Sequence, residues 1–108
     1  MSELLKIGKS NIESTLKEND VVVIDFWASW CGPCRMLTPV FEKLAEDYEA
    51  NSNVVFGKLN VDDENALAVK YGVMTIPTVI IFKNGEEMRR EVGFKPKEHY
   101  AKIINELI

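Results

Sequence analysis

The chain has 108 residues, of which 46% are hydrophobic and 28% charged, as is usual for one globular domain. Its 17 acidic residues outnumber its 13 basic residues, and the basic residues are scattered along the sequence. This charge distribution argues against binding to nucleic acid or to an anionic membrane, and we expect a single domain over residues 1–108 that is monomeric.

The first ten residues lack the basic flank, apolar block and small-residue cleavage site of a secretory signal. No apolar run approaches the length that crosses a membrane, so we expect a cytoplasmic protein. Residues 3–7 predict a short strand. Ser10 and Glu13 have the spacing of a capping box, which predicts a helix over about residues 11–18.

Residues 21–28 are β-branched or aromatic on both faces, which is typical of a central strand covered by helices on both sides. Asp25 is the one charged residue in this stretch. Over residues 32–48 the apolar side chains recur at four-residue steps and predict a helix with a wide buried stripe. Pro39 cannot donate to the carbonyl group of Arg35, so we predict a kink there.

A second strand is predicted over residues 54–61, where Lys58 is set among apolar neighbours. The order strand, helix, strand predicts parallel pairing of the two strands. We expect Asp62 or Asp63 to cap a short helix, which ends at Gly72 in the left-handed conformation.

The last third of the chain predicts a hairpin and a helix. An apolar strand over residues 78–82 is followed by the hairpin signal Asn84-Gly85 and a densely charged strand over about residues 87–92, suited to a sheet edge. Pro96 suits the first position of a terminal helix. The elements together predict an α/β fold, with a central mixed sheet of about five strands flanked by about four helices.

The two cysteines lie in the stretch Trp30-Cys31-Gly32-Pro33-Cys34, where a strand pattern gives way to a helical one. This spacing places both sulfurs on one side of the helix, close enough to form a disulfide. The helix dipole and the free backbone amides at the helix start stabilise a thiolate at Cys31, and Cys34 would then resolve the mixed disulfide. Gly32 leaves room for a substrate backbone, and Pro33 stiffens the ring.

Two other roles of the cysteine pair stay open at this point. A zinc site normally has four ligands, and the chain adds only His99, far away in the terminal helix. A passive disulfide would close too small a loop to stabilise the fold through chain entropy. Thiol–disulfide exchange is therefore favoured, and it needs neither a metal nor an organic cofactor.

Asp25 is a candidate proton acceptor for this exchange. A lone carboxyl group in an apolar strand should have a raised pKa, and this strand leads directly into the cysteine turn.

The W-C-G-P-C stretch after an apolar strand resembles the active site of the thioredoxin family. Further similar motifs, in the same order, are Asp25-Phe26-Trp27-Ala28, Pro39, Lys58-Leu59-Asn60-Val61-Asp62, Ile76-Pro77-Thr78, Phe82-Lys83-Asn84-Gly85 and Val92-Gly93. The resemblance covers the whole chain and implies the thioredoxin fold and a protein-disulfide reductase. It also implies two kinds of partner, a thioredoxin reductase that re-reduces the protein and target proteins that contain disulfides.

The resemblance implies a role for each of four residues. Cys31 resembles the attacking cysteine of the family and Cys34 the resolving one. Asp25 resembles the buried acid, and Lys58 the lysine that favours its ionised form. A purely structural ion pair between Asp25 and Lys58 is the alternative.

The resemblance also implies a substrate-binding surface. Pro77 matches the family's cis-proline, which would present the backbone of Thr75 and Ile76 to an extended substrate segment. The other members of this surface, around Cys31, are Trp30, Gly32, Pro33, Gly93 and Phe94. Met74, Thr75 and Phe94 depart from the residues common in the family, so they bear on the choice of partners.

Two other functions on the same fold stay open. One is a docking or structural subunit without turnover. The other is a disulfide oxidase or isomerase, which arises when the attacking thiolate is so stabilised that the disulfide becomes a strong oxidant. The Gly-Pro linker, Asp25 and the expected cytoplasmic location favour a reductant.

Overall fold

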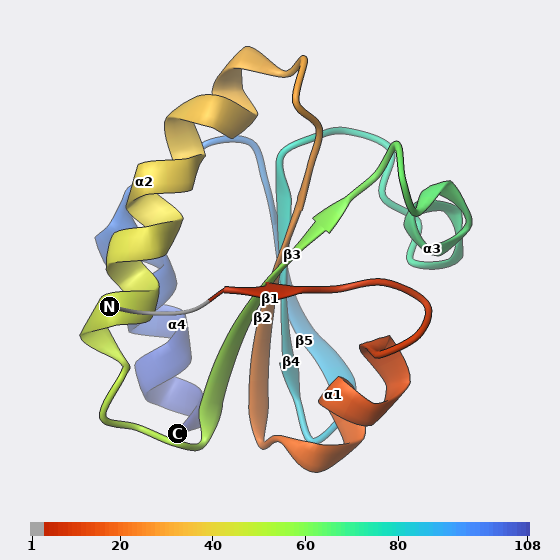
Figure 1. Cartoon of the computed structure of the whole chain (residues 1–108). Coiled ribbons are helices and arrows are strands. Elements are labelled where there is room, and N and C mark those ends of the chain that lie inside the picture. Colours follow the sequence, from red (N-terminus) through yellow and green to blue (C-terminus); the bar gives the residue numbers. More distant parts are fainter. Residues whose placement is uncertain (1–3) are drawn as a thin grey trace.

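The computed structural model describes residues 4–108 and is arranged around one five-stranded sheet (Figure 1). The strands are β1 (Leu5–Lys6), β2 (Val21–Trp27), β3 (Val54–Asn60), β4 (Thr78–Lys83) and β5 (Glu86–Val92). The helices are α1 (Ile12–Glu18), α2 (Gly32–Asp47), α3 (Asn65–Lys70) and α4 (Lys97–Leu107). The strand order is β1-β3-β2-β4-β5, with parallel pairing among the first three and antiparallel pairing of β2, β4 and β5.

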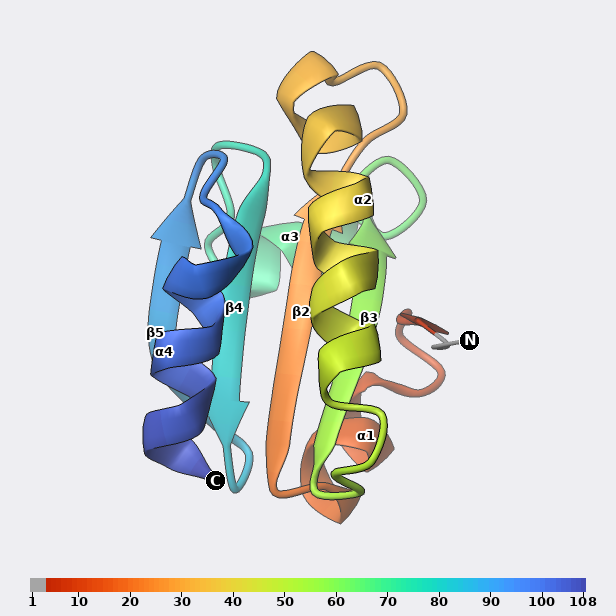
Figure 2. The same ribbon diagram turned by 90° about the vertical axis from the view of Figure 1, so that its left-hand side faces the viewer.

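Helices cover both faces of the sheet, with α2 and α4 on one face and α1 and α3 on the other (Figure 2). Strand β2 lies at the centre and supplies both layers, because successive side chains of a strand point to opposite faces. Val21 and Val23 pack in the layer with α2 and α4, which we call the α2/α4 face. Ile24 and Phe26 pack in the layer with α1, which we call the α1/α3 face.

The same alternation places Asp25 on the α2/α4 face. In the sheet register Asp25 lies beside Lys58 of β3 on one side and Val79 of β4 on the other, and Val79 pairs with Glu91 of β5. Residues paired in register share a face of the sheet. A transverse row therefore runs across the α2/α4 face from Lys58 through Asp25 and Val79 to Glu91.

The structure confirms the predicted strands and helices as elements. The strand predicted over residues 3–7 is observed at Leu5–Lys6, and residue 3 lies outside the described residues. Gly72 has a φ of 67°, and Asn84 and Gly85 both have positive φ values in the hairpin, as predicted. The charged strand β5 lies at an edge of the sheet.

The capping box at Ser10 and Glu13 is a wrong prediction. The N-cap residue of α1 is Asn11, which makes no side-chain capping bond. The amides of Asn11 and Ile12 donate to the carbonyl oxygen of Gly8 instead. The Asn11 side chain also accepts from the Gly8 amide at 2.8 Å, so α1 begins from a turn over residues 8–11 and not from a reciprocal pairing of Ser10 with Glu13.

Two other helix starts also differ from the predictions. Neither Asp62 nor Asp63 caps α3, because the helix begins later, with Glu64 as the N-cap. The amides of Asp62 and Asp63 donate to Asn60 Oδ1 in a separate turn. Pro96 is the extended N-cap of α4 rather than its first helical residue. Pro39 lies inside α2, and the kink there stays a prediction.

Candidate active site

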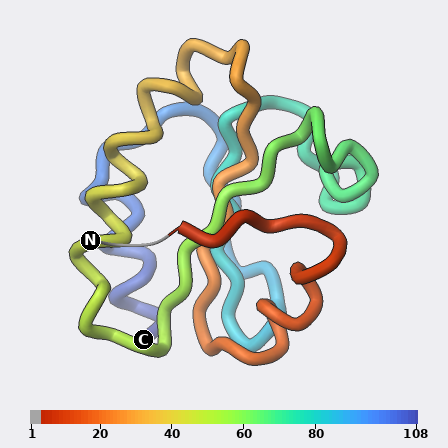
Figure 3. The backbone as a smooth tube through the Cα atoms, in the orientation of Figure 1, coloured from red at the N-terminus to blue at the C-terminus, as the bar shows by residue number. Residues whose placement is uncertain are grey.

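Three loops meet at one end of the sheet, as the chain trace shows (Figure 3). They are the turn from β2 into α2, the segment before β4 and the segment after β5. Since β2 and β5 are both antiparallel to β4, the ends of β2 and β5 lie beside the start of β4. Cys31 Sγ accordingly lies 3.8 Å from the carbonyl oxygen of Ile76, and the Gly93 amide donates to the carbonyl oxygen of Pro77 at 2.8 Å.

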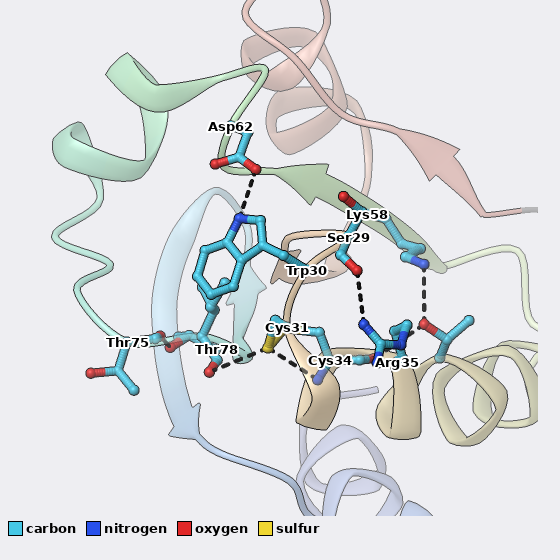
Figure 4. The surroundings of a disulfide bond; sticks show 11 residues. Ser29, Trp30, Cys31, Cys34, Arg35, Lys58, Asp62, Thr75 and Thr78 are labelled. Atoms are coloured by element: carbon cyan, nitrogen blue, oxygen red, sulfur yellow. Dashed lines mark hydrogen bonds between the residues drawn. A yellow bond between two sulfur atoms is a disulfide. The ribbon is translucent and has the colours of Figure 1, made fainter.

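The cysteine pair occupies the start of α2 (Figure 4). Cys31 is the N-cap residue in an extended conformation, Gly32 and Pro33 begin the helix, and a disulfide joins Cys31 to Cys34 with their Cα atoms 5.2 Å apart. The Cys34 amide donates to Cys31 Sγ at 3.2 Å. A backbone N–H directed at this sulfur stabilises negative charge on it, as a reactive thiolate requires. Cys31 is 5% exposed and Cys34 is 0% exposed, so Cys31 is the more accessible of the two.

Asp25 is fully buried, and neither of its carboxylate oxygens has a hydrogen-bond partner among residues 4–108. Burial raises its pKa from 3.8 to about 7, while the positive charge of Lys58 acts in the opposite direction. A carboxyl group with this pKa can take up or release a proton near neutral pH.

Lys58 lies beside Asp25 in the sheet but makes no direct ion pair with it. Its Nζ donates to Thr38 Oγ1 at 3.4 Å (Figure 4). The same Nζ lies 4.3 Å from the centroid of the Trp27 ring. A cation over an aromatic face is a favourable contact. The lysine therefore affects Asp25 through its charge and not through a hydrogen bond.

The predicted substrate-binding residues lie on the turn that holds the cysteines and on the two loops that meet it. The Ile76–Pro77 peptide is cis, as the family resemblance implies. Trp30 is exposed, and its Nε1 donates to Asp62 Oδ2 at 2.9 Å (Figure 4). Phe94 is exposed on the loop after β5, where Gly93 has a φ of 89°. Thr75 and Met74 are exposed on the loop before β4.

Three residues that the sequence analysis did not assign to the site contact or surround its members. Asp62 holds the Trp30 indole, and Thr38 holds the Lys58 ammonium group. Tyr100 is buried on the α2/α4 face, within range of the charge of Asp25. A hydroxyl group on the apolar stripe of α4 is the sequence signal that could have indicated Tyr100.

Within residues 4–108, no three His, Cys, Asp or Glu side chains gather in a way that could hold a metal ion. His99 instead contacts Glu91, with 2.7 Å between its Nε2 and Oε1 of the carboxylate. Over the same residues, no helix has the length and apolar character needed to span a membrane.

A family model for thioredoxin matches residues 3–106. The chain belongs to the thioredoxin family. It is 46% identical over 101 residues to a thioredoxin of Staphylococcus saprophyticus, with 94% of each chain covered. It is 44% identical over 102 residues to a thioredoxin of Staphylococcus aureus, covering 94% of this chain and 95% of that one.

Solved thioredoxin structures have the same fold. A thioredoxin of Malassezia sympodialis superimposes with a TM-score of 0.83 at 38% identity, over 100% of this chain and 94% of the other. A mutant thioredoxin of Halobacterium salinarum gives a TM-score of 0.85 at 38% identity, over 96% of this chain and 88% of the other. The chain therefore has the thioredoxin fold, and its function is that of a thioredoxin-type protein-disulfide reductase with a redox-active disulfide.

Proposed function

We propose that Cys31 is the attacking nucleophile of this thioredoxin and Cys34 its resolving thiol. The Cys31 thiolate attacks one sulfur of a target disulfide, whose S–S bond breaks as its second sulfur leaves as a thiolate. The product is a mixed disulfide between Cys31 and the target. Cys34 then attacks Cys31 Sγ, and the target leaves in its reduced form. Two electrons pass to the target, and the Cys31–Cys34 disulfide remains.

Asp25 is the proposed acceptor of the Cys34 proton in the second step. Its buried carboxyl group has a pKa of about 7, so the carboxylate and the acid are both populated near neutral pH. Lys58 supports the ionised form by its charge. The observation that carries the proposal is the disulfide at the start of α2, with the Cys34 amide donating to Cys31 Sγ.

The exposed backbone before Pro77 is the proposed docking edge for the target. An extended target segment would pair with the main chain of Thr75 and Ile76, in the manner of strand addition. The side chains proposed to border this edge are Trp30, Gly32, Pro33, Gly93 and Phe94. Met74 is proposed to influence which targets dock there.

The proposed cycle is completed by a thioredoxin reductase, which returns the disulfide to the dithiol. We propose that the protein works as a single-domain monomer in the cytoplasm, where thiols are kept reduced, and that it needs no metal or organic cofactor.

Single serine substitutions at the two cysteines test the assigned roles. Cys31→Ser should lower the reduction of a model protein disulfide by dithiothreitol on the order of 10³-fold or more, because the nucleophile is lost. Cys34→Ser should still attack but should accumulate the mixed disulfide, which mass spectrometry of the intact adduct would detect. Capture of the target by Cys31→Ser, through Cys34, would reverse the assignment.

A further inference from the structure

Three buried side-chain oxygens within residues 4–108 have no hydrogen-bond partner. Two are the carboxylate oxygens of Asp25, and the third is the hydroxyl of Tyr100. Both residues are 0% exposed. A buried polar group without a partner is costly, and native proteins satisfy nearly all such groups, frequently with an internal water.

Asp25 of β2 and Tyr100 of α4 lie on the same face of the sheet. Tyr100 of α4 packs in the same cluster as Val79 of β4, and Val79 is the in-register neighbour of Asp25 on the α2/α4 face. The charge of Asp25 raises the pKa of the Tyr100 hydroxyl, after the larger effect of burial. Both groups without a partner therefore lie in the layer between the sheet and its covering helices on this face.

The other polar groups facing this layer already have partners. Lys58 of β3 donates to Thr38 of α2, and Glu91 of β5 contacts His99 and Arg89. Cys34 of α2 is held in the disulfide.

The Tyr100 hydroxyl remains available as a hydrogen-bond donor. Its pKa is also raised by the charge of Glu91 and lowered by the backbone N–H of Lys95, which can only donate to the oxygen. Within residues 4–108 no acceptor lies in hydrogen-bonding geometry to the hydroxyl.

We propose that the Tyr100 hydroxyl donates to a buried water that in turn donates to the Asp25 carboxylate, which makes Tyr100 a positioning residue for the proton acceptor. The hydroxyl and the two carboxylate oxygens offer a water the two to four polar partners that it needs. Hydrogen bonds to the charged form stabilise it, so this link opposes the effect of burial on Asp25. The inference rests on the proposed role of Asp25 and adds a group that tunes it.

Tyr100→Phe tests the proposal because it keeps the packed ring and removes only the hydroxyl. We expect the pKa of Asp25 to rise by about half a unit or more, because the ionised form loses a hydrogen bond. NMR titration of the Asp25 carboxyl carbon would measure this rise. The rate of mixed-disulfide resolution should shift to higher pH by the same amount, while the initial attack on the target is unchanged.

Tyr48→Phe is the matched control. Tyr48 packs against the same layer, but its hydroxyl bonds to the Ala101 carbonyl oxygen and to Asn105 Oδ1. Its removal therefore affects the contact between the end of α2 and α4 and leaves the oxygens of Asp25 and Tyr100 in place. The Asp25 titration should be the same in this variant as in the unmodified protein.

The outcomes separate this inference from the proposed function. An Asp25 titration unchanged by Tyr100→Phe would overturn the link. A shifted titration with an unshifted resolution rate would support the link and contradict the role of Asp25 as proton acceptor. A crystal structure of the unmodified protein gives an independent check: a water bonded to both Tyr100 and Asp25 is expected, and a dry contact would overturn the proposal.

Discussion

The two faces of the central strand β2 differ in what they bury. The α1/α3 face is occupied by apolar side chains such as Ile24, Phe26 and Phe82. The α2/α4 face is apolar at Val21 and Val23 but carries Asp25 one step further along, the only fully buried charged residue among residues 4–108. Because side chains alternate along β2, the buried carboxyl group of Asp25 and the apolar side chains of Ile24 and Phe26 are neighbours in the sequence but lie in separate layers.

The difference has an energetic consequence. An Asp25 pKa of about 7 in the folded state, against an ordinary 3.8, corresponds to a loss of stability on the order of 4 kcal/mol when the group ionises. This loss is a large part of the net stability of a small domain. The apolar α1/α3 face contributes part of the burial energy that offsets it.

Removing a large side chain from the apolar face should have the largest effect on stability. Phe82 is buried on β4 and packs edge-to-face against Tyr71, so Phe82→Ala should lower the free energy of unfolding by about 3–5 kcal/mol. Urea denaturation would measure this loss. The exchange rate per folded molecule should stay unchanged, since Phe82 lies on the face away from the disulfide. A large fall in that rate would show that the two faces are not independent.

Asp25→Asn should raise the free energy of unfolding at pH 8, whereas Phe82→Ala lowers it. The folded-state pKa lies above the unfolded value, so the stability of the unmodified protein falls as pH rises from about 4 to about 7 and then levels off. The variant lacks this fall and should be more stable at pH 8 by up to about 4 kcal/mol. Denaturation at pH 4 and pH 8 would measure the difference.

The same Asp25→Asn variant should resolve the mixed disulfide more slowly near neutral pH, with a smaller effect on the initial attack. Equal slowing of both steps would refute the proton-acceptor role, whatever the gain in stability.

A smaller effect is expected at the neighbouring cation. Lys58→Met keeps the aliphatic chain but removes the charge, so the pKa of Asp25 should rise and the contact with the Trp27 ring should be lost. The expected loss of stability is about 1–2 kcal/mol at pH 8 and less at pH 5, where Asp25 is already protonated. Equal losses at both pH values would mean that Lys58 acts on Trp27 alone.

Local patterns in the sequence were sufficient for the elements and for the burial of Asp25. The apolar run around Asp25 predicts a central strand, and a single carboxyl group in such a strand has only buried positions to occupy. The helix starts were harder, because the preceding turns place Asn11 and Glu64 at the N-cap positions of α1 and α3. The side chains of Asn11 and Asn60 bond amides within those turns. Short sequence patterns do not encode the path of such a turn.

The contacts between distant segments could not be predicted from the sequence. Lys58 matches the lysine of the family motif, but its ammonium group contacts Thr38 and Trp27 and not Asp25. Tyr100 fits the apolar stripe of α4, and only the packing of α4 on the sheet brings it into the layer that also holds Asp25. These features depend on how the helices pack on the sheet, which joins residues that are far apart in the sequence.

The small exposure of the disulfide also determines how electrons pass through the molecule. Cys34 is fully buried and only an edge of Cys31 is accessible, so the proposed roles require every partner to form its covalent bond at Cys31 Sγ. Under the proposed roles, the reductase and the targets cannot be bound productively at the same time. The protein would therefore serve them by turns, with ping-pong kinetics and mutual competition, as a shuttle between two pools and not as a bridge that joins them.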